Sequence, residues 1–399
     1  GVALLATAIV TSVCLEWPLW QTIFLIGTVS IIYTTFGGIV ADVYSDIIQL
    51  AILWAGSLLA IFVLLDLLKP GDLALLSAQQ ERLRIYDFSA TGLGDGKTFG
   101  FWPMLIGGFF LYVSYYGCDQ SQAQRLLTTA TVKQAQKALM INGLFRFLLV
   151  STYCSLGVLL IPFILTHPEF AYRLREQQPD FLVPYFLIEN MPKGILGVII
   201  AGFFAASMSS IDSALNSLSA ATYQDFLMKL FPRLSGIEDS KKVRLSRFLT
   251  IFWGMVATGF ALEMAGGSET VLELVNKIGS AFYGPVLAVF LLGMLLKRAS
   301  QAGAVGGLAA GVGLNISLWL YCGDSVSWLW WNAFGFLMSF AVGYGLGLVF
   351  PCRRISAGLI VNLYEFRREL KTKKYILVLL FAFIIMLLTS FILEKLIAG

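Results

Sequence analysis

The sequence predicts an all-α polytopic membrane protein, and composition and spacing both support this prediction. Of 399 residues, 58% are hydrophobic and 13% are charged, whereas soluble domains average roughly 45–50% apolar and about 25% charged residues. Apolar stretches of roughly 18–25 residues recur from one end of the chain to the other, and each is long enough to cross a hydrocarbon core of ~30 Å. The mean hydropathy of +0.79 agrees with both observations, and the short alternating strands of a membrane barrel are not found.

About eleven apolar segments follow one another, the first incomplete because the sequence opens inside an apolar run. They lie near residues 1–15, 19–38, 43–67, 100–121, 140–165, 194–222, 246–264, 270–296, 302–321, 328–350 and 375–396. We therefore expect part of the N-terminal half of the protein to precede this sequence.

Basic residues predict the orientation of these segments. They gather in the stretches 226–245 and 352–374, whereas the alternate loops 265–269 and 322–327 contain no Lys or Arg. Because short cytoplasmic loops of membrane proteins carry an excess of Lys and Arg, we expect 226–245 and 352–374 to be cytoplasmic basic loops. The formal net charge of +4 thus reports topology and does not indicate nucleic-acid binding.

Cysteine and histidine usage argues against several kinds of site. The five cysteines are scattered without a CxxC pair, and His167 is the only histidine, which disfavours a zinc site, a haem site or a disulfide framework. No nucleophile and base stand together as covalent catalysis requires, so we do not expect an enzyme.

Ionisable residues inside apolar segments are costly, and by default they mark a site or a pathway. Asp46 follows the pair Gly37 and Gly38, which predicts a break between two spans. A carboxylate in the first turn of the second helix is stabilised by the helix dipole, and the alternative is a ligand for a cation or a proton. Snorkelling explains Arg146 and Lys277, which lie near the ends of their segments.

The stretch 202–226 carries a polar stripe inside an apolar segment. At about 100° per residue, one helix face collects Ala206, Ser209, Ser210, Ser213 and Ser217, and Asp212 lies on its flank. Close helix packing is one explanation for small residues and hydroxyls, but packing does not require a carboxylate. Such a stripe suits Na⁺, which prefers oxygen ligands, and hydroxyls with backbone carbonyls supply them without several buried charges.

Two further segments are interrupted. Glycines divide 100–121, and an interrupted membrane helix is tolerated where its freed backbone groups line a cavity. Ser114 and Tyr115 offer hydroxyls within this segment, although a helix end reaching the cytoplasm is the alternative. Asn276 precedes the motif GSAFYGP at 279–285, which predicts another disrupted span.

Four stretches in register resemble signature segments of the sodium/solute symporter family, which includes sodium/glucose, proline, iodide and multivitamin or monocarboxylate transporters. They read YTTFGGIVADVYSDIIQ, GCDQSQAQRLLTTATVKQAQK, AASMSSIDSALNSLSAATYQDF and FYGPVLAVFLLGMLLKR. The resemblance covers nearly the whole chain. It implies a LeuT-type bundle of two inverted five-helix repeats, the first repeat incomplete, and a single transmembrane transporter domain over residues 1–399.

The resemblance also assigns core helices and a sodium site. The segments 19–38, 43–67, 100–121, 194–222 and 270–296 look like core helices four, five, six (broken), eight and ten. The sodium site would take the Ala206 carbonyl and the Ser209 and Ser210 hydroxyls.

A second cation site on the cytoplasmic side occurs in some members of the family. It would use Asp46 with Ser209 and Ser213. Asp212 stands where the family often has a neutral residue, so it either strengthens that second site, binds a proton or pairs with a neighbour. Substrate contacts would include Ser114, Tyr115 and Asn276.

The function implied is sodium-coupled secondary active symport by alternating access. The solute would be a small organic molecule, either a monocarboxylate or vitamin-like anion, a sugar or an amino acid. A transporter-like membrane sensor and a passive channel are the alternatives. We expect a multi-pass protein of the plasma or inner membrane whose partners are Na⁺, the solute and the lipid bilayer, with no nucleic acid; the oligomeric state is left open.

Overall fold

The structure is a computed structural model that describes residues 1–79, 83–174, 179–236, 238–267, 270–296, 299–350 and 373–398. In the stretches 37–45 and 205–207, and at a few further positions, it describes the backbone without the side chains. The described chain consists of helices and turns, with an isolated β-bridge between Leu93 and Val326. The prediction of an all-α protein is confirmed.

Within the described ranges, nine helices are long and apolar enough to cross a membrane. They are Leu19–Phe36, Asp46–Leu67, Val132–Thr166, Lys193–Leu230, Asp239–Met264, Val271–Leu295, Gln301–Cys322, Trp328–Val349 and Lys374–Lys395. Two more of the predicted segments correspond to the short helix α1 (Val2–Leu15) and to a set of shorter helices within 100–121.

The chain forms two compact units. The first comprises Gly1–Gln79 and Arg146–Val275, and the second comprises Gln80–Phe145 and Asn276–Gly399. The long helix α7 (Val132–Thr166) passes from the second unit into the first.

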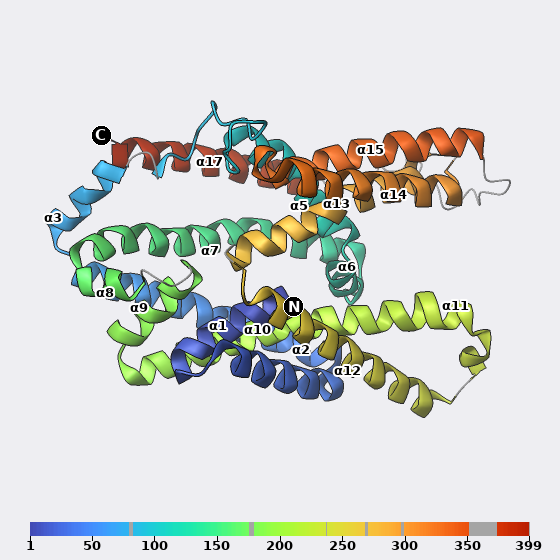
Figure 1. The fold of residues 1–399 in the computed structure, drawn as a ribbon, viewed down its shortest axis with the longest axis horizontal. Helices are drawn as coiled ribbons and strands as arrows, with labels where there is room; N and C mark the ends of the chain where they lie inside the picture. The colour runs from blue at the N-terminus through green and yellow to red at the C-terminus, as the bar shows by residue number, and fades with distance from the viewer. Residues whose placement is uncertain are drawn as a thin grey trace. The chain divides into compact units, whose positions relative to one another are not determined.

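In the first unit, α1, α2 (Leu19–Leu67), α10 (Lys193–Ala221) and α12 (Asp239–Met264) pack side by side (Figure 1). Buried aliphatic side chains join them, among them Leu4, Ile23, Ile26, Ile211, Leu215 and Ala261. Burying a side chain of this kind stabilises by about 1.5–3 kcal/mol against water. Against lipid, the same contacts act through close packing.

A second cluster of buried hydrophobic side chains in this unit is centred on three phenylalanines. The short helices α8 (Pro168–Arg173) and α9 (Leu182–Asn190) bring Phe170 and Phe186 against Phe163 of α7. The Phe163 ring also stacks on the imidazole of His167, with ring centroids 4.1 Å apart. The only histidine of the chain thus contributes to packing.

The two spans predicted on either side of Gly37 and Gly38 are found as separate candidate membrane spans, Leu19–Phe36 and Asp46–Leu67, although the backbone stays helical through the pair and α2 counts 49 residues. Glycine disfavours a helix by only about 1 kcal/mol relative to alanine and keeps its N–H group, so neighbouring residues can carry the helix through the pair. Proline would have removed a hydrogen bond and blocked the preceding turn.

The predicted disruption at 279–285 is wrong. Helix α13 (Val271–Leu295) continues through Pro285. Proline has no N–H group, so it leaves the carbonyl four residues earlier without its helical donor, and this carbonyl belongs to Ala281. Asn315, on the neighbouring helix α14 (Gln301–Ser317), donates its side-chain amide to that oxygen at 3.1 Å.

In the second unit, α14 and α15 (Trp328–Val349) lie side by side (Figure 1), and glycines form their contact. On α14 the contact positions recur every four residues, at Gly303, Gly307 and Gly311. A Cβ added at Gly307 would lie 2.5 Å from the carbonyl oxygen of Ser339 on α15. Small residues at four-residue spacing let membrane helices approach backbone to backbone.

The segment 100–121 is divided, but its main break lies at Asp119. A π-helix, Pro103–Gly107, leads into α5 (Gly108–Cys118), and α6 (Gln120–Leu127) follows. The Asp119 carboxylate caps α6 by accepting hydrogen bonds from the backbone N–H groups of Ser121 and Gln122, which is a strongly preferred N-cap arrangement.

The structure describes most of one predicted basic loop, 226–245, and almost none of the other, 352–374. The described part of 226–245 is mostly helical: a π-helix ends at Leu227, α11 (Met228–Leu230) and a 3-10 helix (Pro232–Gly236) follow, and α12 begins at Asp239. Asp239 suits the first turn of α12 and pairs with Lys242 at 2.8 Å. The stretch 352–374 lies outside the described residues, except for its last two positions at the start of α17 (Lys373–Ala398).

Candidate functional site

The site is built where α2 meets α10 in the first unit. The Ser209 hydroxyl of α10 donates a hydrogen bond to Oδ1 of Asp46 on α2. One turn further along α10, Asp212 accepts a hydrogen bond from the Thr34 hydroxyl of α2. Ser209 is 7% exposed and Asp212 is 2% exposed, so two carboxylates and two hydroxyls meet in a largely buried contact.

The spacing of these contacts shows that α2 curves. At a rise of 1.5 Å per residue, Thr34 and Asp46 would be about 18 Å apart on a straight helix. Their partners Asp212 and Ser209 are only about 4.5 Å apart along α10. The helix therefore bends between Thr34 and Asp46, and Gly37 and Gly38 lie in that stretch, where glycine commonly accompanies curvature.

The three residues predicted for the sodium site lie on α10. Ala206 belongs to the helix, and its carbonyl keeps one lone pair beyond the helical hydrogen bond. The Ser209 hydroxyl donates its hydrogen bond to Asp46, whereas the Ser210 side chain is exposed.

The predicted second cation site comes together in part. The structure joins Asp46 to Ser209 and leaves Ser213 half-buried, and it gives Asp212 a different partner, Thr34. Asp212 is therefore aimed at the first half of α2, where the sequence analysis named no ligand.

The residues predicted to contact substrate lie in the second unit. The Ser114 hydroxyl on α5, 1% exposed, donates to the carbonyl oxygen of Tyr283 on α13 at 2.6 Å. The Tyr115 hydroxyl accepts from the Gln122 side chain at 2.8 Å. Asn276 is half-buried on α13.

Lys277 differs from its sequence interpretation. Its side chain is buried, and Nζ lies 5.8 Å from the ring centroid of Trp319, within the range of a cation–π contact. Snorkelling to the membrane surface therefore does not describe this lysine.

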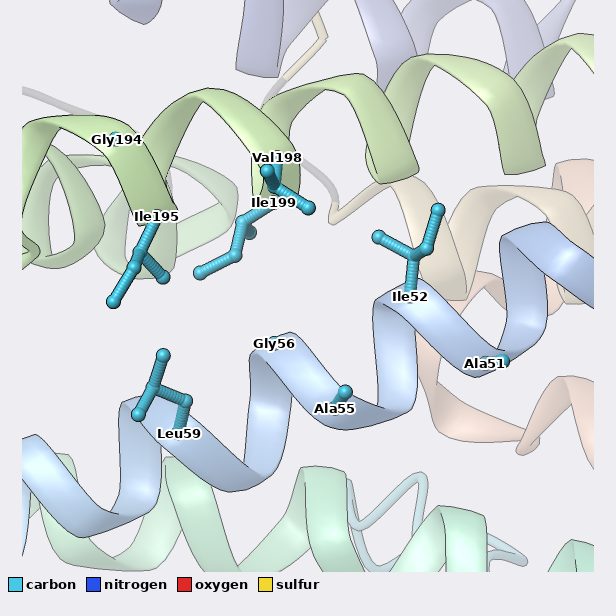
Figure 2. A pocket seen from close by; sticks show the side chains of 9 residues that line it. All are labelled: Ala51, Ile52, Ala55, Gly56, Leu59, Gly194, Ile195, Val198 and Ile199. Carbon is cyan, nitrogen blue, oxygen red and sulfur yellow. The ribbon is translucent and has the colours of Figure 1, made fainter.

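An apolar groove of about 460 Å³ lies between α2 and α10, nearer the start of α10 (Figure 2). Its lining consists of Ala51, Ile52, Ala55, Gly56, Leu59, Gly194, Ile195, Val198 and Ile199. Figure 2 shows Ile195 and Ile199 of α10 pointing toward α2. Because all nine side chains are apolar or absent, this groove offers no group that could orient a polar solute or an ion.

Ser30 and Thr34 were missed by the sequence analysis. A signal was present, because they are polar residues four apart in a largely apolar span, and such residues share one helix face. The hydroxyls of Ser12 and Thr11, which bond only to their own helix, show why the pattern alone is ambiguous.

A family model described as the sodium:solute symporter family matches residues 1–311. The chain belongs to this family. Its relatives in the sodium:solute symporter family include the sodium/iodide cotransporter of Homo sapiens, 28% identical over 82% of this chain and 50% of that protein. The sodium-coupled monocarboxylate transporter 2 of Bos taurus is 31% identical over 81% of this chain and 51% of that protein.

A third relative, the sodium-dependent multivitamin transporter of Oryctolagus cuniculus, is 29% identical over 82% of this chain and 50% of that protein. The chain therefore spans about half the length of these relatives. Among solved structures, a Na⁺-coupled sialic acid symporter in a substrate-bound outward-open state is similar, with a TM-score of 0.72 and 23% identity. That match covers 89% of this chain and 72% of the other. It confirms the LeuT-type fold, and the family and the membrane helices confirm a multi-pass membrane protein.

Proposed function

We propose that this chain forms the transport core of a sodium-coupled symporter for a small organic solute. The observation that carries the proposal is the contact of Ser209 with Asp46, which places a carboxylate on the hydroxyl stripe of α10. Hydroxyl, carbonyl and carboxylate oxygens are the ligands that hard cations prefer. Membership of the family adds support.

Two positions for Na⁺ follow from this arrangement. The first uses the Ala206 carbonyl with the hydroxyls of Ser209 and Ser210, and the second uses Asp46 with Ser213 and Asp212. A neutral set of ligands binds Na⁺ weakly enough to release it, whereas Asp46 supplies a negative charge that attracts the ion. Because Ser209 belongs to the first set and contacts Asp46, an ion leaving the first position meets a ligand of the second.

Sodium drives the solute only if it binds one conformation better than the other, because a ligand shifts an equilibrium by its differential affinity alone. Each Na⁺ moved inward also gains ~2.3 kcal/mol per 100 mV of membrane potential. Ion binding on α10 would thus favour the solute-accepting state, and loss of the ion toward the cytoplasm would make the step directional.

The solute we propose is a monocarboxylate or vitamin-like anion, in keeping with what the relatives are named for; a sugar or an amino acid is the alternative. Ser114, Tyr115 and Asn276 are the proposed contacts. Since Ser114 already donates to the Tyr283 carbonyl, the solute would have to exchange that hydrogen bond for its own.

The test is uptake by vesicles containing the full-length protein, with candidate solutes and an inward Na⁺ gradient. We expect accumulation above equilibrium, abolished when an ionophore collapses the gradient. Equal flux with and without the gradient would indicate a passive channel, and solute binding without flux would indicate a sensor. Either outcome would overturn the proposed function.

A further inference from the structure

Asp212 is a buried carboxylate that the family pattern does not account for. Its side chain is 2% exposed on a helix long and apolar enough to span a membrane. An ionised carboxylate at such depth is costly unless a cation or several hydrogen bonds compensate its charge. The polar groups of α2 that lie next to Asp212 therefore indicate how its charge can be compensated.

The Thr34 hydroxyl lies between two acceptors. Its Oγ1 is 2.7 Å from the carbonyl oxygen of Ser30 and also contacts Oδ1 of Asp212. A hydroxyl has one hydrogen to donate and two lone pairs. Thr34 can therefore donate to one of the two oxygens, and the lone pairs of its own oxygen stay available to an electrophile or a donor.

Ser30 adds an oxygen that has no hydrogen-bond partner. Its side chain is 1% exposed, and its Oγ is buried and unpaired. Ser30 lies one turn from both Ile26 and Thr34, on the same face of α2. That face meets α10, because Ile26 shares a buried cluster with Ile211 and Thr34 contacts Asp212.

We propose that Ser30, Thr34 and Asp212 form a further Na⁺ position, which Asp212 serves in place of the position at Asp46 and Ser213. The ligands would be the Ser30 and Thr34 hydroxyls, one carboxylate oxygen of Asp212 and the Ser30 carbonyl oxygen, which the Thr34 hydroxyl now contacts at 2.7 Å. All four are oxygens, which suits a hard cation, and one Na⁺ neutralises the single carboxylate. A bound ion also uses the Ser30 hydroxyl and the Thr34 lone pairs, which a hydrogen bond from Thr34 alone leaves unused.

Other charged groups lie near, but they have partners of their own. Asp46 of α2 is engaged by Ser209. Arg247 of α12 stacks on Phe36, with its guanidinium carbon 5.3 Å from the ring centroid. The position therefore adds a third place for Na⁺ on the same helix, and it rests on the proposed sodium-coupled function.

The experiment compares the wild type with Asp212→Asn, Thr34→Val and Ser30→Ala in the full-length protein. The matched control is Thr35→Val, because the neighbouring Thr35 hydroxyl bonds only to the Ile31 carbonyl of its own helix, at 2.6 Å. Two quantities are measured: the Na⁺ concentration that gives half-maximal thermal stabilisation in detergent, and the number of Na⁺ ions moved per solute in vesicles.

We expect Asp212→Asn to lower the stoichiometry by one Na⁺ and to raise the half-stabilising Na⁺ concentration by at least about tenfold. Thr34→Val and Ser30→Ala should raise that concentration in the same direction, and Thr35→Val should leave it unchanged. If Asp212→Asn does not fold, the two milder variants decide the question by the same measurements.

The outcomes separate this inference from the proposed function. Unchanged stoichiometry and unchanged Na⁺ stabilisation in all three variants would overturn the further position and show that Thr34 and Asp212 only join two helices. The proposed function would survive that result as long as the wild type still accumulates solute with Na⁺. A wild type that shows no Na⁺-driven accumulation would overturn both.

Discussion

The close approach of α14 and α15 gives a sharp prediction about stability. In Gly307→Ala, the new Cβ would lie 2.5 Å from the Ser339 carbonyl oxygen and 3.0 Å from the Gly343 Cα. The three nearest atoms, the Ser339 carbonyl oxygen and the Gly343 Cα and N, all belong to the backbone, so rotating a side chain cannot relieve these contacts. The matched variant Gly313→Ala adds the same methyl group on the same helix, where nothing lies within 4 Å.

The magnitude follows from these distances. Ordinary contact begins near 3.4 Å, so the two helices must separate by about 0.9 Å at this point, and overpacking of this kind costs about 1–3 kcal/mol. Alanine regains up to about 1 kcal/mol of helix propensity at either position. We therefore expect Gly307→Ala to be less stable than Gly313→Ala by about 2 kcal/mol.

The assay is thermal unfolding of the purified full-length protein in detergent, with both variants measured under identical conditions. Gly307→Ala should unfold at a lower temperature than the wild type, and Gly313→Ala at the same or a higher temperature. Equal midpoints for the two variants would refute the claim that glycine is required at position 307 for backbone contact.

Two further predictions concern buried and exposed polar groups. Asn315→Leu leaves the carbonyl freed by Pro285 without its donor, so it should destabilise the protein by about 1–3 kcal/mol, whereas Ser317→Ala on the same helix should have little effect; equal unfolding midpoints would contradict this. The pKa of Asp95 is lowered to about 2, first by the hydrogen bond from the backbone N–H of Lys97. A carboxylate with a lowered pKa contributes stability at pH values above its ordinary pKa of 3.8, and this stability is lost as the pH falls toward 2. Opening of this exposed loop, followed by hydrogen exchange, should therefore increase over that pH range in the wild type. In Asp95→Asn, the extent of opening should not change over the same range.

Much of the fold could be predicted from the sequence, because crossing a bilayer fixes both the length and the apolarity of a helix. The continuous course of α13 could not, because it depends on Asn315, a residue 30 positions after Pro285 that supplies the missing donor. The same holds for α2, because glycine permits either a turn or a helix and the sequence does not decide between them.

The sequence likewise indicated some of the candidate site and not the rest. The stripe on α10 follows from helical periodicity, and the contact of Ser209 with Asp46 agrees with the resemblance that paired them. The partner of Asp212 was not predictable, because nothing in a single sequence indicates which face of 19–38 meets α10. Lys277 shows the same limit, since its position near a helix end gave no indication that Trp319 would cover it.

The measurement that tests the central claim most directly is the Na⁺ dependence of uptake in the double variant Ser209→Ala with Ser210→Ala. The control is Ser219→Ala, which removes a buried hydroxyl from the same helix, bonded to the Ser246 carbonyl at 3.0 Å. We predict that the double variant inserts normally and needs at least about tenfold more Na⁺ for half-maximal uptake, while the control does not differ from the wild type. An unchanged Na⁺ requirement in the double variant would contradict the assignment of α10 as the sodium-binding helix.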